Sequence, residues 1–320
     1  MIEKFVELGE RLRGFGGDDT SRDVMRRAIE HNPWFTEEDI LRAVDAICVE
    51  MLDGAKLAAW RSRYTPATTP QRVAIIMAGN IPLVGFFDLL CVLCSGHHAY
   101  VKPSSKDRVM MEYVIDLLRD IDADIPIFAY NSEAKYDMAI ATGGDEANAY
   151  FRQHFEGTRT LLRGSRHSVA VLDGAESDEE LQGLWNDITF YSGLGCRSVS
   201  MLFIPEGRDV VLPKREAANP KLRNNLRQRR ALYAVQRRDV RDYGAFIDLE
   251  QEVFPTSLAE VAVRRYRDVE EVRTWLAEHR DGVQCVVSHL AIEGCVPFGR
   301  AQYPLLMDYA DGVDTMKFLL

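Results

Sequence analysis

The sequence is poor in cysteine, lacks long apolar runs and carries no excess of positive charge. It has 6 cysteines in 320 residues and a net charge of −10. A chain this acidic is not typical of nucleic-acid-binding proteins, whose contact surfaces are basic. The longest apolar run, residues 81–94, contains Asp88 and is too short to cross a bilayer. The chain opens with Met-Ile-Glu-Lys and shows no basic segment followed by an apolar one, so we see no signal peptide and expect a cytoplasmic protein with reduced thiols.

Several motifs that would define an enzyme class directly are also absent. The sequence contains no complete three-glycine dinucleotide fingerprint and no nucleophile-elbow serine. No pair of His or Cys residues has the spacing of a zinc site, so we expect no metal. Cys91 and Cys94 have the spacing of a redox motif, but they lie within an apolar stretch and are interpreted as core residues. No internal repeat is evident.

The composition is that of an ordinary globular protein, and the length is sufficient for two domains. Apolar residues make up 47% of the chain and charged residues 28%. Residues 1–65 are predicted to be helical, with Thr36 as a helix cap before an acidic first turn. A Pro- and Thr-rich linker, residues 65–70, follows. The chain then alternates between strands and helices, which predicts an α/β fold with a parallel sheet.

The sequence predicts nine strands and four helices after the linker. Strands are expected at 72–77, 99–102, 125–130, 138–141, 168–172, 201–204, 231–235, 259–263 and 283–288, and helices at 86–94, 106–121, 145–155 and 269–279. Residues 178–190 form an amphipathic stretch. Residues 206–230 are basic and polar, and are interpreted as a solvated face or mobile loop, with contact to a phosphorylated ligand as an alternative.

Cys196 is the strongest candidate for a chemical role. Gly193 and Gly195 precede it, which frees the backbone to turn sharply and leaves the thiol uncrowded. Arg197 follows directly, and a neighbouring cation favours the thiolate. The thiol is expected on a loop between an amphipathic stretch and a strand, where catalytic groups often lie. The alternative is a buried structural cysteine, which is the interpretation given to the other five.

Three further stretches are weaker candidates. Residues 142–144 (Thr-Gly-Gly) follow a strand and open a helix, so their N–H groups could hold a phosphate, although such a turn often needs glycine anyway. Lys102 ends a strand, where α/β sheets bind ligands, but an exposed lysine is common there. Asn80 lies in a turn after the first strand and has an amide that could donate to an oxyanion, or it is simply a turn residue.

Four stretches in this order resemble the aldehyde dehydrogenase superfamily, and within it the LuxC-type acyl-CoA reductases, also called fatty-acid reductases. Residues 79–85 (Gly-Asn-Ile-Pro-Leu-Val-Gly) resemble its oxyanion turn, and residues 101–107 (Val-Lys-Pro-Ser-Ser-Lys-Asp) resemble its ribose-binding segment. Residues 193–200 (Gly-Leu-Gly-Cys-Arg-Ser-Val-Ser) resemble the nucleophile loop of the acyl-CoA reductases. Residues 297–302 and 308–316 resemble the C-terminal signature of that branch.

The resemblance implies a role for particular residues. Cys196 would be the acyl-accepting nucleophile, and Asn80 with the Cys196 backbone N–H would bind the oxyanion. Lys102 would contact the adenosine ribose, and Ser105 stands where NAD-selective relatives often have glutamate, which favours NADPH over NADH. The remaining cofactor residues would be Thr142, Gly143 and Gly144 at the pyrophosphate, and Glu252 with Phe254 at the nicotinamide ribose, with Glu250 as a competitor for Glu252.

The implied architecture has a Rossmann-like nucleotide-binding domain and an α/β catalytic domain. We expect a helical N-terminal region over residues 1–65, the first part of the nucleotide-binding domain over 66–167 and the catalytic domain over 168–290. A C-terminal tail, residues 291–320, would return to the first domain or to a neighbouring subunit, and we expect a homo-oligomer.

The implied reaction is the NAD(P)H-dependent reduction of an acyl-CoA or acyl-protein thioester to the aldehyde. Aldehyde-oxidising relatives have a glutamate that activates water, whereas the matching stretch here is Leu162-Arg163-Gly164. An aldehyde-oxidising dehydrogenase is therefore a less favoured alternative. A catalytically silent scaffold of the same fold is the other alternative.

Overall fold

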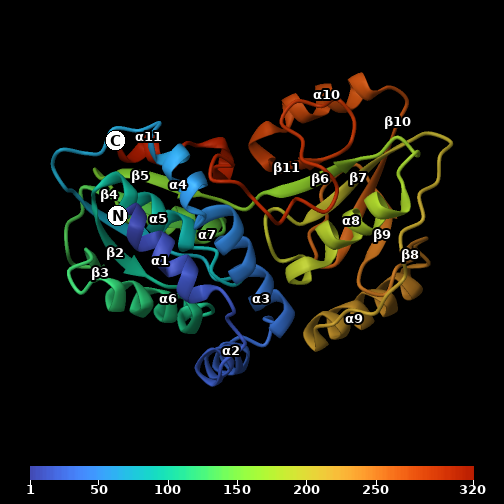
Figure 1. The fold of residues 1–320 in the computed structure, drawn as a ribbon. Coiled ribbons are helices and arrows are strands. Elements are labelled where there is room, and N and C mark those ends of the chain that lie inside the picture. Colours follow the sequence, from blue (N-terminus) through green and yellow to red (C-terminus); the bar gives the residue numbers. More distant parts are fainter. The chain divides into compact units, whose positions relative to one another are not determined.

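The computed structural model describes all 320 residues and divides into two compact units (Figure 1). Unit 1 comprises residues 1–165 together with 304–320, and unit 2 comprises residues 166–303. Each unit has its own β-sheet.

Unit 1 is built on a five-stranded parallel sheet with the strand order β3-β2-β1-β4-β5. Its strands are β1 (Arg72–Ile76), β2 (His98–Lys102), β3 (Ile127–Ala129), β4 (Met138–Thr142) and β5 (Arg159–Arg163). The apolar runs of β1 and β4 are buried, as expected for strands covered on both faces. The order reverses at β1, which lies between β2 and β4, and such a switch point is where open α/β sheets bind ligands at the carboxyl ends of their strands.

The helices of unit 1 include the three that the sequence predicts between strands. The complete set is α1 (Ile2–Leu12), α2 (Asp19–His31), α3 (Glu37–Ala46), η1 (Ile47–Met51), α4 (Gly54–Arg61), α5 (Phe86–Ser95), α6 (Arg108–Ile121), α7 (Asp145–His154), η4 (Ala310–Gly312) and α11 (Thr315–Leu319). The predicted cap is confirmed, because the Thr36 hydroxyl accepts a hydrogen bond from the Asp39 N–H at 3.1 Å. No helix in either unit is long and apolar enough to cross a membrane.

The N-terminal helices and the C-terminal segment both pack into unit 1. Phe5 on α1 meets Phe86 on α5 edge to face, with ring centroids 6.2 Å apart, and both side chains are fully buried. The buried His97 accepts from the Gln71 N–H through Nδ1, so its Nε2–H donates to the Leu319 carbonyl at 2.8 Å. These contacts hold the chain ends against the helices around the sheet.

A buried ion pair joins three elements of unit 1. Arg163, the last residue of β5, donates through Nη1 to both carboxylate oxygens of Asp88 on α5, at 2.5 and 2.7 Å. Its Nη2 donates to the hydroxyl of Thr315 on α11 at 2.7 Å. All three side chains are buried. The Arg163 guanidinium therefore connects β5, α5 and α11 inside unit 1.

Unit 2 is built on a six-stranded sheet with the order β11-β6-β7-β10-β9-β8. Its strands are β6 (His167–Val171), β7 (Val199–Pro205), β8 (Arg241–Asp242), β9 (Ile247–Glu250), β10 (Glu260–Tyr266) and β11 (Val283–Val287). All neighbours are parallel except β8 and β9. The predicted parallel α/β architecture is thus confirmed in both units.

The predicted strand at residues 231–235 is wrong, because this segment belongs to a helix. The helices of unit 2 are α8 (Asp178–Thr189), η2 (Phe190–Gly193), α9 (Pro220–Gln236), α10 (Val269–Glu278) and η3 (Arg280–Gly282). The Asn219 side chain caps α9 and Pro220 occupies its first turn. Leu222, Leu226 and Tyr233 are the buried residues of α9, and they recur at helical spacing. The short run Ala-Leu-Tyr-Ala-Val looks like a strand only when it is separated from this longer pattern.

Candidate functional site

Cys196 lies on an exposed turn just before β7. Three consecutive residues ahead of it, Tyr191, Ser192 and Gly193, have φ values of 54°, 56° and 72° in the left-handed region. Two of them are not glycine, and holding such residues there takes surrounding structure. A tight turn follows, closed by the hydrogen bond from the Ser198 N–H to the Gly195 carbonyl at 3.0 Å, with Cys196 at its tip. The predicted exposure of this thiol is confirmed.

Asp187 on α8 anchors the C-terminal signature beside this turn. It accepts from the Gly299 N–H at 2.6 Å and from the Ala301 N–H at 3.0 Å. The side chain is fully buried, and burial raises its pKa to about 7 despite these hydrogen bonds. The backbone at Gly183 approaches the same segment so closely that a Cβ there would lie 2.8 Å from the Gly299 nitrogen.

The residues after Cys196 reach the same segment from the other side. The guanidinium of Arg197 donates through Nε to the Ala301 carbonyl, and its Nη2 lies 3.7 Å from the Cys285 sulfur. The Gln302 amide donates to the Ser198 hydroxyl at 3.0 Å. The first part of the C-terminal signature therefore packs against the Cys196 turn. Asp187, Arg197 and Ser198 make the hydrogen bonds that join the two.

A histidine that the sequence analysis did not select also lies beside the turn. His167 Nδ1 is 2.9 Å from the Ser200 hydroxyl, and the neighbouring Ser168 hydroxyl donates to the Cys196 carbonyl at 2.9 Å. The His167 ring stacks on Phe254 with centroids 4.2 Å apart. Burial lowers the pKa of His167. No local sequence signal could have identified this residue, because its partners come from distant parts of the chain.

The two candidate ribose carboxylates of unit 2 are both exposed. Glu252 pairs with Arg264 at 3.1 Å, and Glu250 pairs with Arg265 at 3.0 Å. Phe254, by contrast, is partly buried against the core that contains Trp275. Phe254 is thus connected through His167 to Ser200 of β7, whereas the choice between Glu252 and Glu250 stays open.

A pocket of about 730 Å³ lies at the carboxyl edge of the unit 1 sheet. Lys102 and Ser105, two of the predicted cofactor residues, line it, together with the ends of β1 and β3 and one face of α6. The Lys102 Nζ lies 5.8 Å from the centroid of the Tyr130 ring, which also borders the pocket. Its volume is in the range of small-molecule sites.

The turn that contains Asn80 packs tightly against the Lys102–Asp107 segment. A Cβ at Gly79 would lie 2.5 Å from the Ser104 Oγ, so only glycine fits. The Leu83 N–H donates to Asp107 at 2.8 Å, and Leu83 itself has a φ of 57°. Burial raises the pKa of Asp107 well above its ordinary value. Two stretches of the resemblance are therefore in direct contact within unit 1.

Residues 142–144 end β4 and begin α7. A Cβ at Gly143 would lie 2.7 Å from the Ala147 Cβ, so the glycine is required by packing. The Gly143 N–H is already used, because it donates to the Arg163 carbonyl at 3.1 Å. Asp145 and Glu146 follow in the first turn of α7 and place negative charge where a phosphate would bind. Phosphate binding at this turn is therefore supported by position and opposed by charge.

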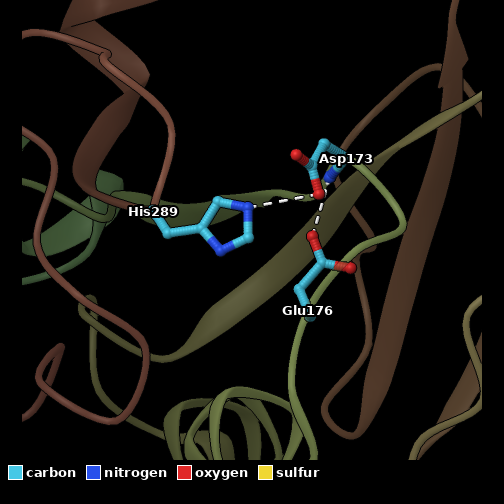
Figure 2. A group of neighbouring side chains, drawn as sticks. All are labelled: Asp173, Glu176 and His289. Atoms are coloured by element: carbon cyan, nitrogen blue, oxygen red, sulfur yellow. Dashed lines mark hydrogen bonds and ion pairs between the residues drawn. The ribbon is translucent and has the colours of Figure 1, made fainter.

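One further group of side chains, in unit 2, has atoms close enough to hold a metal ion. Figure 2 shows Asp173 between His289 and Glu176, with the potential ligand atoms of all three within 4.8 Å of one another. Glu176 already accepts from the N–H groups of Asp173 and Gly174, and His289 lies 3.2 Å from Asp173 and 2.7 Å from Glu180. These hydrogen bonds and ion pairs join the side chains to one another and stabilise the loop that follows β6.

The fold places the chain among proteins with the aldehyde dehydrogenase architecture. Aldehyde dehydrogenase 21 from Physcomitrella patens superposes with a TM-score of 0.62 at 12% identity, covering 91% of this chain and 72% of that one. An NADP-dependent enzyme from E. coli gives the same TM-score at 10% identity, with coverages of 91% and 72%. At such identities the likeness concerns the fold.

The sequence defines the family. The family described as acyl-CoA reductase (LuxC) matches residues 33–271, and the chain belongs to it. Long-chain acyl-protein thioester reductase 2 from Photobacterium leiognathi is 25% identical over 158 residues, which are 44% of this chain and 33% of that protein. The corresponding reductase from Aliivibrio fischeri is 25% identical over 153 residues, 42% of this chain and 32% of that protein. The matched segment thus spans about a third of the length of these relatives.

Proposed function

We propose that this protein reduces an acyl thioester, carried on CoA or on a protein, to the aldehyde through an acyl-enzyme at Cys196. The observation that carries the proposal is the exposed thiol on a turn held by three left-handed residues and by the family's C-terminal signature. The matched relatives, named as acyl-protein thioester reductases, support the reaction class. Buried cysteines elsewhere in the chain have no comparable setting.

The proposed chemistry of the chain is nucleophilic. The Cys196 thiolate attacks the thioester carbonyl carbon, a new C–S bond forms, and the CoA or carrier thiolate leaves. We assign oxyanion stabilisation to the Cys196 N–H and the Asn80 amide, following the resemblance of their turns. A bound nicotinamide cofactor supplies the hydride that converts the acyl group to the aldehyde, after which the free thiolate of Cys196 is restored.

The residues of unit 1 fit such a cofactor. The pocket beside β2 offers Lys102 and Ser105 to a ribose. Gly79 has no side chain, which lets Ser104 of the ribose-binding segment pack against it. We propose NADPH as the preferred donor, because Ser105 is neutral and a glutamate there would repel a 2′-phosphate. We assign Thr142, Gly143 and Gly144 to the pyrophosphate, and Phe254 with Glu252 or Glu250 to the nicotinamide ribose.

The variant Ser105→Glu tests the cofactor assignment. We expect it to lower kcat/KM for NADPH by about tenfold relative to NADH, since one new like-charge contact is worth roughly 1.4 kcal/mol. The matched control is Glu133→Gln, an exposed residue of unit 1 outside the pocket lining. A wild-type preference for NADH, or an unchanged ratio in Ser105→Glu, would contradict the assignment.

The aldehyde-oxidising alternative is less favoured, because the stretch that resembles the water-activating segment is Leu162-Arg163-Gly164 and offers no carboxylate. The Arg163 side chain in this stretch is buried and bound to Asp88. A guanidinium has no lone pair with which to accept a proton. We also propose a homo-oligomer in the cytoplasm, where six free cysteines would remain reduced.

The proposed function is tested by incubating the protein with acyl-CoAs of graded chain length while the oxidation of NADPH and NADH is followed in parallel. We expect one equivalent of aldehyde per equivalent of cofactor oxidised. A catalytically silent scaffold would form no aldehyde with any chain length, and its Cys196 would show no selectively fast alkylation. An oxidising dehydrogenase would instead reduce NAD(P)⁺ with the free aldehyde and release acid.

A further inference from the structure

The helix α9 carries an unusual concentration of positive charge for this chain. Residues 206–241 contain 11 Lys and Arg and 4 Asp and Glu, a net charge of +7 in a protein whose total is −10. Within α9 itself there is no acidic residue at all. Charge separated in this way creates a local positive potential that attracts acidic partners.

Two pairs of arginines on and just after α9 differ in their contacts. Arg229 and Arg230 face the unit, where Arg229 lies 3.2 Å from Glu260 and Arg230 binds both oxygens of Asp242. Arg227 on α9 and Arg238, two residues after its end, are exposed and contact the neutral side chains of Asn224, Gln251 and Tyr233. The first group holds the helix in place, and the second leaves its charge on the surface.

Apolar side chains lie on the same exposed face. Val235 is 84% exposed and Leu232 is 40% exposed. Residues 227, 231 and 235 recur at intervals of four, which places them along one side of the helix, and Arg238 follows two residues after its end. A helical face that exposes large apolar residues between arginines has the composition of a protein interface.

This face lies at the sheet edge that carries the nucleophile. Arg229 and Tyr233 of α9 both contact Glu260, the first residue of β10. Strand β10 is parallel to β7, so both begin at the same edge, and the Cys196 turn directly precedes β7. Leu258, just before β10, would lie 3.8 Å from a Cβ at Gly193 in that turn. Figure 1 shows α9 at the opposite end of unit 2 from α10.

We propose that the exposed face of α9 docks an acidic protein that carries the acyl thioester to Cys196. The inference rests on the proposed function, because it assigns a place for the carrier of that substrate. The helical part of the face runs from Arg227 to Val235, about 12 Å, and its exposed Leu232 and Val235 offer apolar contacts that a protein can use and a phosphate cannot. A symmetric dimer through α9 would oppose its arginines to the same arginines of the second copy, since a two-fold interface pairs a surface with itself.

The test uses the whole chain and, as a probe, a fluorescent acyl carrier protein with a non-cleavable acyl thioether on its phosphopantetheine. Binding is measured by fluorescence anisotropy at several salt concentrations. We expect Arg227→Glu/Arg238→Glu to weaken binding at least tenfold and to flatten its salt dependence, because steering charges act on association and are screened by salt. The matched control Arg267→Glu/Arg273→Glu makes the same charge change at exposed sites of unit 2 away from α9, and should bind within about twofold of the wild type.

The outcomes separate this proposal from the proposed function. Reduction of acyl-CoA by Arg227→Glu/Arg238→Glu should stay within about threefold of the wild type, which also shows that the variant folds. Equal affinity of the α9 variant and the wild type for the probe, no binding by the wild type, or an equal loss in the control variant would overturn the docking site. So would light scattering that shows the α9 variant losing a dimer. Failure of the wild type to reduce acyl-CoA would refute the proposed function, while anisotropy would still decide the docking.

Discussion

Helix α5 of unit 1 and the Cys196 turn of unit 2 place their cysteines in opposite environments. In unit 1, Cys91 and Cys94 lie on α5 and are buried among apolar side chains. Burial raises the pKa of Cys94 to about 12 and that of Cys91 well above the ordinary value. In unit 2, Cys196 is exposed at the tip of a turn. Both regions have features that suggest a reactive thiol from sequence, namely the C-x-x-C spacing of α5 and the glycines and Arg197 around Cys196.

The difference shows that C-x-x-C spacing does not by itself expose a thiol, whereas a turn with left-handed residues does so at Cys196. A helix with an apolar composition buries whatever thiols it carries, and a buried thiol resists ionisation. The Cys196 turn needs left-handed residues and support from Asp187, so its sequence is constrained for a reason other than core packing. Charged groups differ in the same way, because the Arg163–Asp88 pair is buried whereas the Arg273–Glu270 pair is exposed.

The largest effect is expected from Cys196→Ala compared with Cys91→Ala. Cys196→Ala should abolish acyl-CoA reduction and leave the thermal unfolding midpoint unchanged, since truncating an exposed side chain creates no cavity. Cys91→Ala should retain activity and lower the free energy of unfolding by about 1–3 kcal/mol. Steady-state kinetics and urea unfolding on both variants measure this. Wild-type turnover in Cys196→Ala would remove the nucleophile from the mechanism.

The second prediction concerns the acyl-enzyme. Because the stretch Leu162-Arg163-Gly164 offers no carboxylate to act as a general base, we expect hydrolysis of the adduct to be about 10²–10⁴-fold slower than with such a base. The protein is acylated with acyl-CoA without cofactor, and the Cys196 adduct is followed by intact mass. If free fatty acid appeared as fast as reductive turnover, another carboxylate, such as Glu252, would have to reach the site.

Thiol alkylation should separate the two regions directly. With a pKa of about 12, Cys94 is about 10⁻⁴ ionised at pH 8, and burial blocks the reagent in addition. Cys196 is exposed, so iodoacetamide should modify it well before Cys91 or Cys94. Peptide mass spectrometry over a time course measures the rates. Comparable labelling of α5 in the folded protein would contradict the contrast between the units.

The buried charges of unit 1 should matter more for stability than exposed ones in unit 2. Arg163→Ala leaves Asp88 buried without its partner and should lower the free energy of unfolding by about 3–5 kcal/mol. The control is Arg273→Ala, which removes an exposed pair with Glu270 and should change it by about 0.5 kcal/mol or less. Urea unfolding gives both values. Similar losses would show that burial does not set the difference.

The smallest effect is expected at His289, and it should depend on pH. The hydrogen bond to Glu180, followed by the pairing with Asp173, raises the pKa of His289 above its ordinary value. The stabilising contribution is therefore fully present below the unfolded pKa of about 6.5 and is lost as pH rises through the higher folded pKa. His289→Gln should destabilise the protein at pH 5.5 by about 1 kcal/mol or less and have less effect at pH 9. A loss that is the same at both pH values would point to packing against Phe298 instead.

Most of the sheet architecture could be predicted because buried parallel strands leave a simple signal. The apolar runs of β1 and β4 are readable from composition alone, and so is the helix Arg108–Ile121 from its periodicity. The segment 231–235 was misassigned because five residues can fit a strand, whereas only the capped run from Asn219 reveals the helix. Whether a short apolar segment forms a helix or a strand depends on a stretch of sequence longer than five residues.

The sequence by itself determined the family, the candidate nucleophile Cys196 and two residues that line the pocket of unit 1, Lys102 and Ser105, because these depend on short local patterns of glycine, cysteine and lysine. Only the tertiary structure decided which distant residues contact the Cys196 turn and the segments beside it. Asp187 meets Gly299 and Ala301, and His167 meets Phe254, across long stretches of chain. It also decided that Arg163 is an interior ion pair rather than an exposed charge. Such partners are chosen by the packing of distant elements, and local residue patterns carry no record of that choice.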